Sequence, residues 1–251
     1  LEDAMELYRK ALEIKKKTLG DDHSSVAMTY YNMAMVKKTL GEAHSSVAST
    51  YNNMANVMES QGKLQDAMEL YRKALEIYKK TVGEDHLDVT DTYNNIAIVL
   101  ETQGKLENAM ELYRAALEIY KKTLGEDHPD VASAYNNMGL VLESQGKLDD
   151  AMELYRKALE IYKKTLGVDH SDVAGVYNNM ANVLRSRGKL DDAMELHRKA
   201  LEIHKKTLGE DHSSVANTYN NMANVLQSQG KLDDAMELHR KALEIYKKTL
   251  G

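Results

Sequence analysis

A 42-residue repeat constrains the fold of this chain more than any other feature of its sequence. Aligning residues 126–167 with residues 168–209 gives 32 identities in 42 positions, which indicates duplication of one structural unit. A Tyr-Asn-Asn triplet recurs at the same step, starting at Tyr51, Tyr93, Tyr135, Tyr177 and Tyr219. The period divides most of the chain into five full units, at 42–83, 84–125, 126–167, 168–209 and 210–251. Such a chain is expected to stack similar units side by side.

Each unit is predicted to contain two helices, of which the first begins the unit. In the unit at 126–167, apolar residues recur at steps of four, three and four, the spacing of one helix face, at Val131, Tyr135, Met138 and Leu142. Pro129 suits the first helical position, where a missing N–H costs nothing. Gly146 is expected to end this helix, since glycine takes a left-handed conformation at little cost.

The second helix of the unit is predicted to open at Asp150–Glu153, which has the spacing of a capping box. Its apolar stripe consists of Ala151, Leu154, Ala158, Ile161 and Tyr162. The small residues Ala151 and Ala158 would let neighbouring helices approach closely. A single helical hairpin of this kind cannot bury its apolar face alone, so the pattern predicts an all-α stack of hairpins.

Composition excludes several classes of function. The chain has 33 basic and 39 acidic residues, a formal charge of −6, which argues against nucleic acid as a partner. No apolar run reaches the length of roughly 18 residues expected of a membrane span. The absence of cysteine leaves no disulfide, thiolate metal site or cysteine nucleophile. No signal peptide is recognisable, and the chain opens at Leu1 inside a helical pattern, so we expect it to be part of a longer protein.

The residues of each unit resemble the tetratricopeptide repeat (TPR) family. The signature positions in the unit at 42–83 are Tyr51, Met54, Ala55, Gly62, Leu64, Ala67, Tyr71 and Ala74. The segments 124–132, 135–138 and 145–148 are similar to the 42-residue variety of kinesin light chains and nephrocystin-type arrays. The resemblance implies a right-handed TPR-like superhelical solenoid of about twelve helices over residues 1–251, in the cytoplasm. The chain departs from the common repeat in lacking a proline after the second helix.

The beginning of the chain departs from the period. Residues 1–20 match a lone second helix, and residues 21–41 match half of a first helix fused to half of a second. We therefore expect a local irregularity near 20–45. An alternative is one continuous helix through Gly41 that is exchanged between chains, because Ala43 replaces the usual aspartate there.

By the same resemblance, the first helices would line a concave groove. An amide both donates and accepts hydrogen bonds, so a ladder of asparagines suits the backbone of an extended peptide. The ladder positions would be Asn52, Asn94, Asn136, Asn178 and Asn220, with Asn56, Asn182 and Asn224 one turn on. The alternative is that duplication simply copied them. The second asparagine of each triplet is expected to have a structural role between helices.

The next groove position varies in charge, through Glu59, Glu101, Glu143 and Arg185, with Arg187 close by. A groove acidic in its first half and basic near 185–187 would prefer a ligand of matching polarity. The competing interpretation is a solvated surface whose charge varies freely between repeats. The lysines of a carboxylate clamp for chaperone C-termini are absent, since asparagine stands where the first would be.

Histidines recur in two patterns that we interpret as structural. An Asp-His pair stands at 22–23, 85–86, 127–128, 169–170 and 211–212, with Ala43-His44 as the exception, and groups spread over different repeats cannot converge on one substrate or metal ion. These pairs are expected to serve in loops and helix caps. His197, His204 and His239 replace tyrosines of other units and are expected to be partly buried. We therefore predict no enzyme, no cofactor, no metal and no small-molecule substrate.

The sequence thus predicts a protein-interaction scaffold that binds peptide segments of partner proteins in its groove. The alternative is a structural element that associates with itself, through uncapped solenoid ends or a swapped N-terminal region. For the last helix, the sequence predicts an exposed stripe at Ala235, Leu238, Ala242 and Ile245, and exposed apolar patches tend to find partners.

Overall fold

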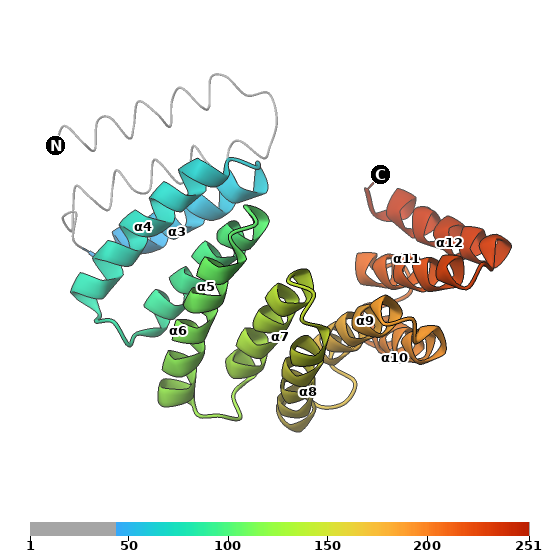
Figure 1. Cartoon of the computed structure of the whole chain (residues 1–251). Helices are drawn as coiled ribbons and strands as arrows, with labels where there is room; N and C mark the ends of the chain where they lie inside the picture. Colours follow the sequence, from blue (N-terminus) through green and yellow to red (C-terminus); the bar gives the residue numbers. More distant parts are fainter. Residues whose placement is uncertain (1–43, 251) are drawn as a thin grey trace, which may run out of the picture. The chain divides into compact units, whose positions relative to one another are not determined.

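The computed structural model describes residues 44–250, and every regular element in that part of the chain is an α-helix (Figure 1). The helices follow one another as pairs with a short loop inside each pair, as the two-helix unit predicted. The chain divides into two compact units, Leu1–Thr123 and Leu124–Gly251, each with its own internal packing.

The first compact unit has four helices in its described part: α3 (Ser45–Ser60), α4 (Leu64–Thr81), α5 (Leu87–Thr102) and α6 (Leu106–Leu124). Tyr71 of α4 is completely buried, and it shares one apolar cluster with Ala55 of α3 and with Ile96 and Val99 of α5. The second helix of one pair therefore packs on the first helix of the next pair. Full burial of a large apolar side chain contributes about 2 kcal/mol, so this stacking stabilises the pairs.

The second compact unit repeats this arrangement with six helices: α7 (Pro129–Ser144), α8 (Leu148–Thr165), α9 (Ser171–Ser186), α10 (Leu190–Leu208), α11 (Ser213–Ser228) and α12 (Leu232–Leu250). Ala181 of α9, Met194 of α10 and Val225 of α11 belong to one buried cluster. Ala151 and Ala158 of α8 are completely buried, as expected for small residues between closely packed helices.

A histidine caps the beginning of every first helix that the structure describes. Its Nδ1 accepts a hydrogen bond from the backbone N–H two residues on, at 3.1–3.3 Å, in His44, His86, His128, His170 and His212. The aspartate before four of these histidines pairs with a lysine 37 residues on, as Asp127 does with Lys164 at 2.5 Å. The predicted role of the Asp-His pairs in caps and loops is confirmed. The remaining pair, in residues 1–43, lies outside the described residues.

The expected helix ends at Pro129 and Gly146 are also confirmed. Pro129 begins α7, and Gly146 follows the C-cap of that helix with φ at +75°, in the left-handed region. The capping box predicted at Asp150–Glu153 is wrong, because α8 begins at Leu148 and its N-cap Lys147 makes no side-chain cap bond. The tight turn through Gly146 starts the helix earlier, so Asp150 lies in the first turn, where its charge favours the helix dipole.

The exposed apolar face of α12 differs from the predicted one. Ala235 and Ala242 are 1% exposed and Ile245 is 7% exposed, while Leu238 is half-buried. Ala242 and Ile245 pack against α11, because the helix turns this stripe toward its own partner in the pair. The large apolar side chains left exposed on α12 are Leu232, Met236 and Leu243, at 66%, 54% and 51%.

Three predictions fall on residues that the structure does not describe. The lone helix at 1–20, the fused half-repeat at 21–41 and the irregularity near 20–45, including an exchanged helix through Gly41, lie at residues 1–43 or rest on them. One continuous solenoid over 1–251 stays a prediction, since each compact unit is defined by its own packing. Within residues 44–250, helices are too short or too polar to cross a membrane.

Candidate functional site

The first asparagine of the triplet turns into the protein wherever a threonine stands 40 residues on. Asn178 is 9% exposed, and its Nδ2 donates to Thr218 Oγ1 at 3.1 Å. Its Oδ1 lies 2.7 Å from Nδ1 of buried His197. Asn52 donates to Thr92 Oγ1 in the same way, at 3.0 Å. Both amides therefore hold neighbouring first helices together.

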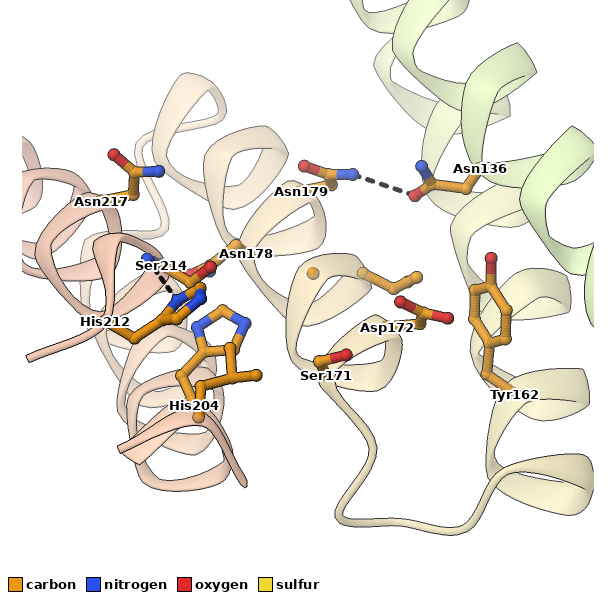
Figure 2. Close-up of a pocket in the computed structure, with 13 residues that line it drawn as sticks. Asn136, Tyr162, Ser171, Asp172, Asn178, Asn179, His204, His212, Ser214 and Asn217 are labelled. Atoms are coloured by element: carbon orange, nitrogen blue, oxygen red, sulfur yellow. Dashed lines mark hydrogen bonds between the residues drawn. The ribbon is translucent and has the colours of Figure 1, made fainter. Parts of the chain in front are cut away.

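Asn136 is placed differently because the residue 40 positions on is Val176, which has no hydroxyl. Its Oδ1 accepts a hydrogen bond from Nδ2 of Asn179, the second asparagine of the next triplet, at 2.9 Å (Figure 2). Both side chains are half-buried and border a cavity. The Asn179 bond from α9 to α7 fits the structural role expected of second asparagines, and it leaves amide groups beside open space.

The remaining ladder positions bond within their own helix pair. Asn94 Nδ2 donates to the Tyr120 hydroxyl at 2.8 Å, and Asn220 Oδ1 lies 2.9 Å from Nδ1 of His239. Oδ1 of Asn52 and of Asn94 is buried without a hydrogen-bond partner. The five positions therefore do not present five equivalent free amides.

The asparagines one turn further along are closer to solvent. Asn56 and Asn224 are exposed, and Asn182 is half-buried. Oδ1 of Asn56 accepts from the Tyr71 hydroxyl at 2.6 Å, which fixes its orientation. These positions can meet a ligand without breaking a contact between repeats.

The three glutamates predicted for the groove each pair with a buried tyrosine twelve residues on. In each pair the tyrosine hydroxyl donates to the glutamate carboxylate: Tyr71 to Glu59 at 2.8 Å, Tyr113 to Glu101 at 3.4 Å, and Tyr155 to Glu143 at 2.9 Å. Burial raises the pKa of Glu101 and Glu143, while the tyrosine hydrogen bond acts in the opposite direction. These half-buried carboxylates are thus tied to their own repeat.

The unit at 168–209 replaces both members of this pair, with Arg185 for glutamate and His197 for tyrosine. Burial, and secondarily the charge of Arg185, lower the pKa of His197 to about 4, so the ring is neutral at pH 7. His197 Nε2 and Arg185 Nε are both buried without a hydrogen-bond partner. Sequence reasoning singled out both residues but missed their coupling, which the twelve-residue spacing of Tyr71 and Glu59 could have indicated.

The predicted burial of the substituted histidines is confirmed, since His197 and His204 are buried and His239 is half-buried. Arg187, expected to add positive charge near the groove, instead donates to Asp149 Oδ1 at 2.6 Å. Because Asp149 lies at the start of α8, this pair joins two consecutive repeats. The positive charge of Arg187 is therefore neutralised by Asp149.

A polar cavity of about 520 Å³ lies in the second compact unit, beside Asn136 and Asn179. Side chains of α7, α8, α9, α10 and α11 contribute to its lining (Figure 2). Sequence reasoning did not find this cavity. The sequence feature that could have indicated the cavity is the combination of Gly175 and His204. These are two of the ten positions at which the unit at 168–209 differs from the unit at 126–167.

The accessible groups of these residues are of a kind that can contact a ligand. Within residues 44–250, groups of three or more His, Cys, Asp or Glu side chains that could hold a metal ion do not occur. The histidines of the Asp-His pairs act at helix caps, and the buried tyrosines and carboxylates satisfy one another. What stays accessible is a set of amides on first helices and a polar cavity between them.

Stacked helical hairpins with these intervals define a helical-repeat protein. The tetratricopeptide repeat family model matches residues 46–122, 88–164 and 172–248, and a second model of the same description matches residues 1–25. The chain belongs to the tetratricopeptide repeat family, whose fold is a scaffold for protein–protein interaction. The comparison with curated proteins gives no match.

Solved structures share the fold. BtubC (BKLC) from P. vanneervenii is 22% identical over 92% of this chain and 93% of its own, with a TM-score of 0.74. A protein from Podosopora anserina described as a kinesin light chain with nearly identical TPR-like repeats is 25% identical over 82% and 98%, with a TM-score of 0.64. RapI in its apo form is 18% identical over 99% of both chains, with a TM-score of 0.66. The chain is therefore a TPR-like solenoid similar to repeat proteins of the kinesin light chain type.

Proposed function

We propose that the chain binds extended peptide segments of partner proteins along its first helices. The observation that carries the proposal is the pair Asn136 and Asn179, half-buried amides on adjacent first helices that are linked at 2.9 Å beside an open cavity. Amides so placed can donate to and accept from a peptide backbone whatever its side chains. The proposed contact positions are Asn52, Asn56, Glu59, Asn94, Glu101, Asn136, Glu143, Asn178, Asn182, Arg185, Asn220 and Asn224.

The structure divides these positions by accessibility. Asn56, Asn136 and Asn224 could contact a peptide with little rearrangement, because they are exposed or border the cavity. Asn178 would act indirectly, by fixing α9 against α11 through Thr218. Membership of the family and the likeness to a protein described as a kinesin light chain support binding of other proteins. They also support the proposal that the chain is not an enzyme and needs no cofactor.

The test is selection from a peptide display library, followed by affinity measurements on the selected peptides. Asn136→Ala should weaken binding about tenfold, as expected for loss of one or two hydrogen bonds. Asn108, an exposed amide on the second helix α6, provides the matched control, and Asn108→Ala should leave the affinity unchanged. Failure of the library to yield any peptide, or equal effects of the two substitutions, would reject the proposal.

A second candidate function is self-association through α12. Leu232, Met236 and Leu243 are more than half exposed on one helix, whereas Leu190 and Met194, the equivalents of the first two, pack against the next first helix. A copy of the chain that offered a similar helix could cover them. The measurement is solution mass by light scattering over a wide concentration range.

Under this second candidate, Met236→Lys should convert an oligomer into a monomer of 28.3 kDa. Val168 is 61% exposed outside α12, so Val168→Lys is the control and should not change the mass. A mass that is monomeric at every concentration in the unsubstituted chain would remove this candidate.

A further inference from the structure

A side-chain bridge joins the two helices of four of the five described pairs. A polar residue near the start of the first helix bonds to a tyrosine 29 residues on, near the end of the second. The bridges are Ser49 with Tyr78 at 2.8 Å, Asp91 with Tyr120 at 2.8 Å, Ser133 with Tyr162 at 2.7 Å, and Asn217 with Tyr246. Each bridge thus links the start of the first helix to the end of the second.

The pair α9 and α10 lacks this bridge because both partners are replaced. Gly175 stands where the polar residue would be, and His204 stands in place of the tyrosine. The ring of His204 turns toward the next repeat, where its Nδ1 lies 3.2 Å from Thr218 Oγ1. A Cβ atom placed on Gly175 would meet nothing within 4 Å. The two changes therefore leave open space without leaving strain.

The cavity of about 520 Å³ occupies this space. In Figure 2, Asp172 and Tyr162 lie on one side, His204 and His212 lie on the other, and Asn136 and Asn179 border the edge between their helices. Its volume falls in the range of roughly 300–1,000 Å³ that is usual for ligand pockets.

The charge of the lining favours a cation. Asp172 is the acidic side chain of the lining, and lysine and arginine do not line the cavity in the part of the chain that the structure describes. Nδ1 of His212 already accepts from the Ser214 N–H, and burial lowers the pKa of His204. The half-buried His170 lies beside Asp172, where its Nδ1 accepts from the Asp172 N–H and stands 3.5 Å from the carboxylate.

Helix dipoles do not reverse this preference. The first turns of α9 and α11 reach the cavity with their positive ends, at Ser171 and Ser214, but the last turn of α10 reaches it with its negative end, at Leu208. Histidine caps on α9 and α11 already accept from one backbone N–H group at each positive end. The carboxylate of Asp172 is therefore the dominant local charge.

We propose that this cavity binds the guanidinium group of an arginine side chain from an extended peptide, with Asp172 as its charged partner. The planar guanidinium has five donors and can reach a carboxylate together with neutral acceptors, and Asn179 and Ser171 are residues of the lining that carry such acceptors. The unit at 168–209 would thus read one side chain of a peptide, while the amides on first helices contact its backbone. This specificity rests on the proposed peptide-binding function.

The experiment uses the whole chain, labelled with ¹⁵N, and small probes that report on the cavity alone. N-acetyl-arginine methylamide is titrated against its neutral isostere, N-acetyl-citrulline methylamide, and the resonances of Gly175 and Asn179 are followed by NMR. We expect arginine to shift both resonances with millimolar affinity and citrulline to bind about tenfold more weakly, because it lacks the charge. Equal binding of the two probes, or no shift with arginine, would overturn the proposal.

Two variants locate the site. Gly175→Ser combined with His204→Tyr rebuilds the bridge that Ser133 and Tyr162 form in the preceding repeat, so it should fold and should abolish the shift of the Asn179 resonance. Asp172→Asn should weaken arginine binding about tenfold. Asp130 is its equivalent beside the intact Ser133 bridge, and Asp130→Asn should have no effect. Unchanged arginine binding in the double variant would overturn the proposal.

The outcomes separate this inference from the proposed function. Selected peptides that bind equally well to the bridge-restored variant would leave the peptide scaffold standing and overturn the arginine site. Arginine-specific shifts in a chain that captures no peptide would instead reject the peptide scaffold, while they support an arginine-binding cavity.

Discussion

Nδ1 of His197 lies 2.7 Å from Oδ1 of Asn178, and both side chains are buried in the pair formed by α9 and α10. In the preceding repeat this place is taken by Tyr155, whose hydroxyl donates to Glu143. Duplication followed by two substitutions has thus exchanged a tyrosine–carboxylate bond for an imidazole–amide bond. Because Arg185 replaces the glutamate, a protonated ring would face a cation in a buried place, and the histidine is therefore held neutral.

The first prediction is a loss of stability in mild acid caused by His197. The pKa of His197 falls from 6.5 to about 4 on folding. Between pH 6.5 and 4 this histidine is therefore protonated in the unfolded chain and neutral in the folded chain. The contribution of neutral His197 to the free energy of unfolding is complete above pH 6.5. It is lost as the pH falls toward 4, by about 3 kcal/mol in all. Urea unfolding at a series of pH values measures it.

His197→Tyr is the control for this effect, since tyrosine occupies the same place in three described repeats and does not titrate in this range. The variant should unfold with a shallower dependence on pH between 6.5 and 4. Parallel pH profiles of the variant and the unsubstituted chain would contradict the assignment to His197.

Much of the fold could be predicted because duplication repeats the same local signals. Pro129 and Gly146 mark the ends of α7 where the sequence placed them, since each acts through its own backbone preference. The start of α8 at Leu148 was missed, because the turn through Gly146 decides it and the Asp150 side chain does not. Local chemistry therefore predicts a boundary well only where the residue itself forms the boundary.

The candidate site was less predictable because its geometry depends on residues far apart in sequence. Asn136 and Asn178 stand in identical triplets, yet Asn136 is half-buried and bonds to Asn179 while Asn178 is buried and bonds to Thr218, as Val176 or Thr218 dictates. The cavity at Gly175 depends in the same way on a residue 29 positions away. Side chains 29 or 40 residues apart come into contact only when the helices are packed against one another.

The second prediction concerns Val176→Thr, which introduces a hydroxyl 40 residues after Asn136. By the precedent of Asn178 and Thr218, the Asn136 amide should turn inward and release Asn179. Stability should change by less than about 1 kcal/mol, because one hydrogen bond replaces another. Exchange of the side-chain amide protons of Asn136, followed by NMR, should become slower.

The matched control is Val176→Ala, which removes bulk without adding a hydroxyl. It should leave the exchange of Asn136 unchanged, although the smaller side chain will cost stability because Val176 is 2% exposed. If both substitutions slow the exchange equally, the residue 40 positions on does not direct the asparagine.

The third prediction concerns the histidine caps. His212→Ala removes the acceptor for the Ser214 N–H and should destabilise α11 by about 1 kcal/mol. His212→Asn keeps an acceptor at the N-cap and should restore most of the loss. Hydrogen exchange of the Ser214 amide should accelerate in the alanine variant alone, and equal exchange in the two variants would show that the imidazole is not the cap.

The fourth prediction compares alanine substitutions at two glycines that have different backbone conformations. Gly146 has φ at +75°, where a Cβ atom is strained, so Gly146→Ala should destabilise the second compact unit by about 1 kcal/mol. Gly175 lies inside α9 and would meet no neighbour, so Gly175→Ala should stabilise that helix by about 0.5–1 kcal/mol. Urea unfolding midpoints should therefore move in opposite directions. A destabilising Gly175→Ala would mean that the open space at Gly175 is closed in solution, and the cavity proposed for an arginine side chain would be lost with it. A stabilising Gly146→Ala would instead contradict the left-handed backbone at Gly146.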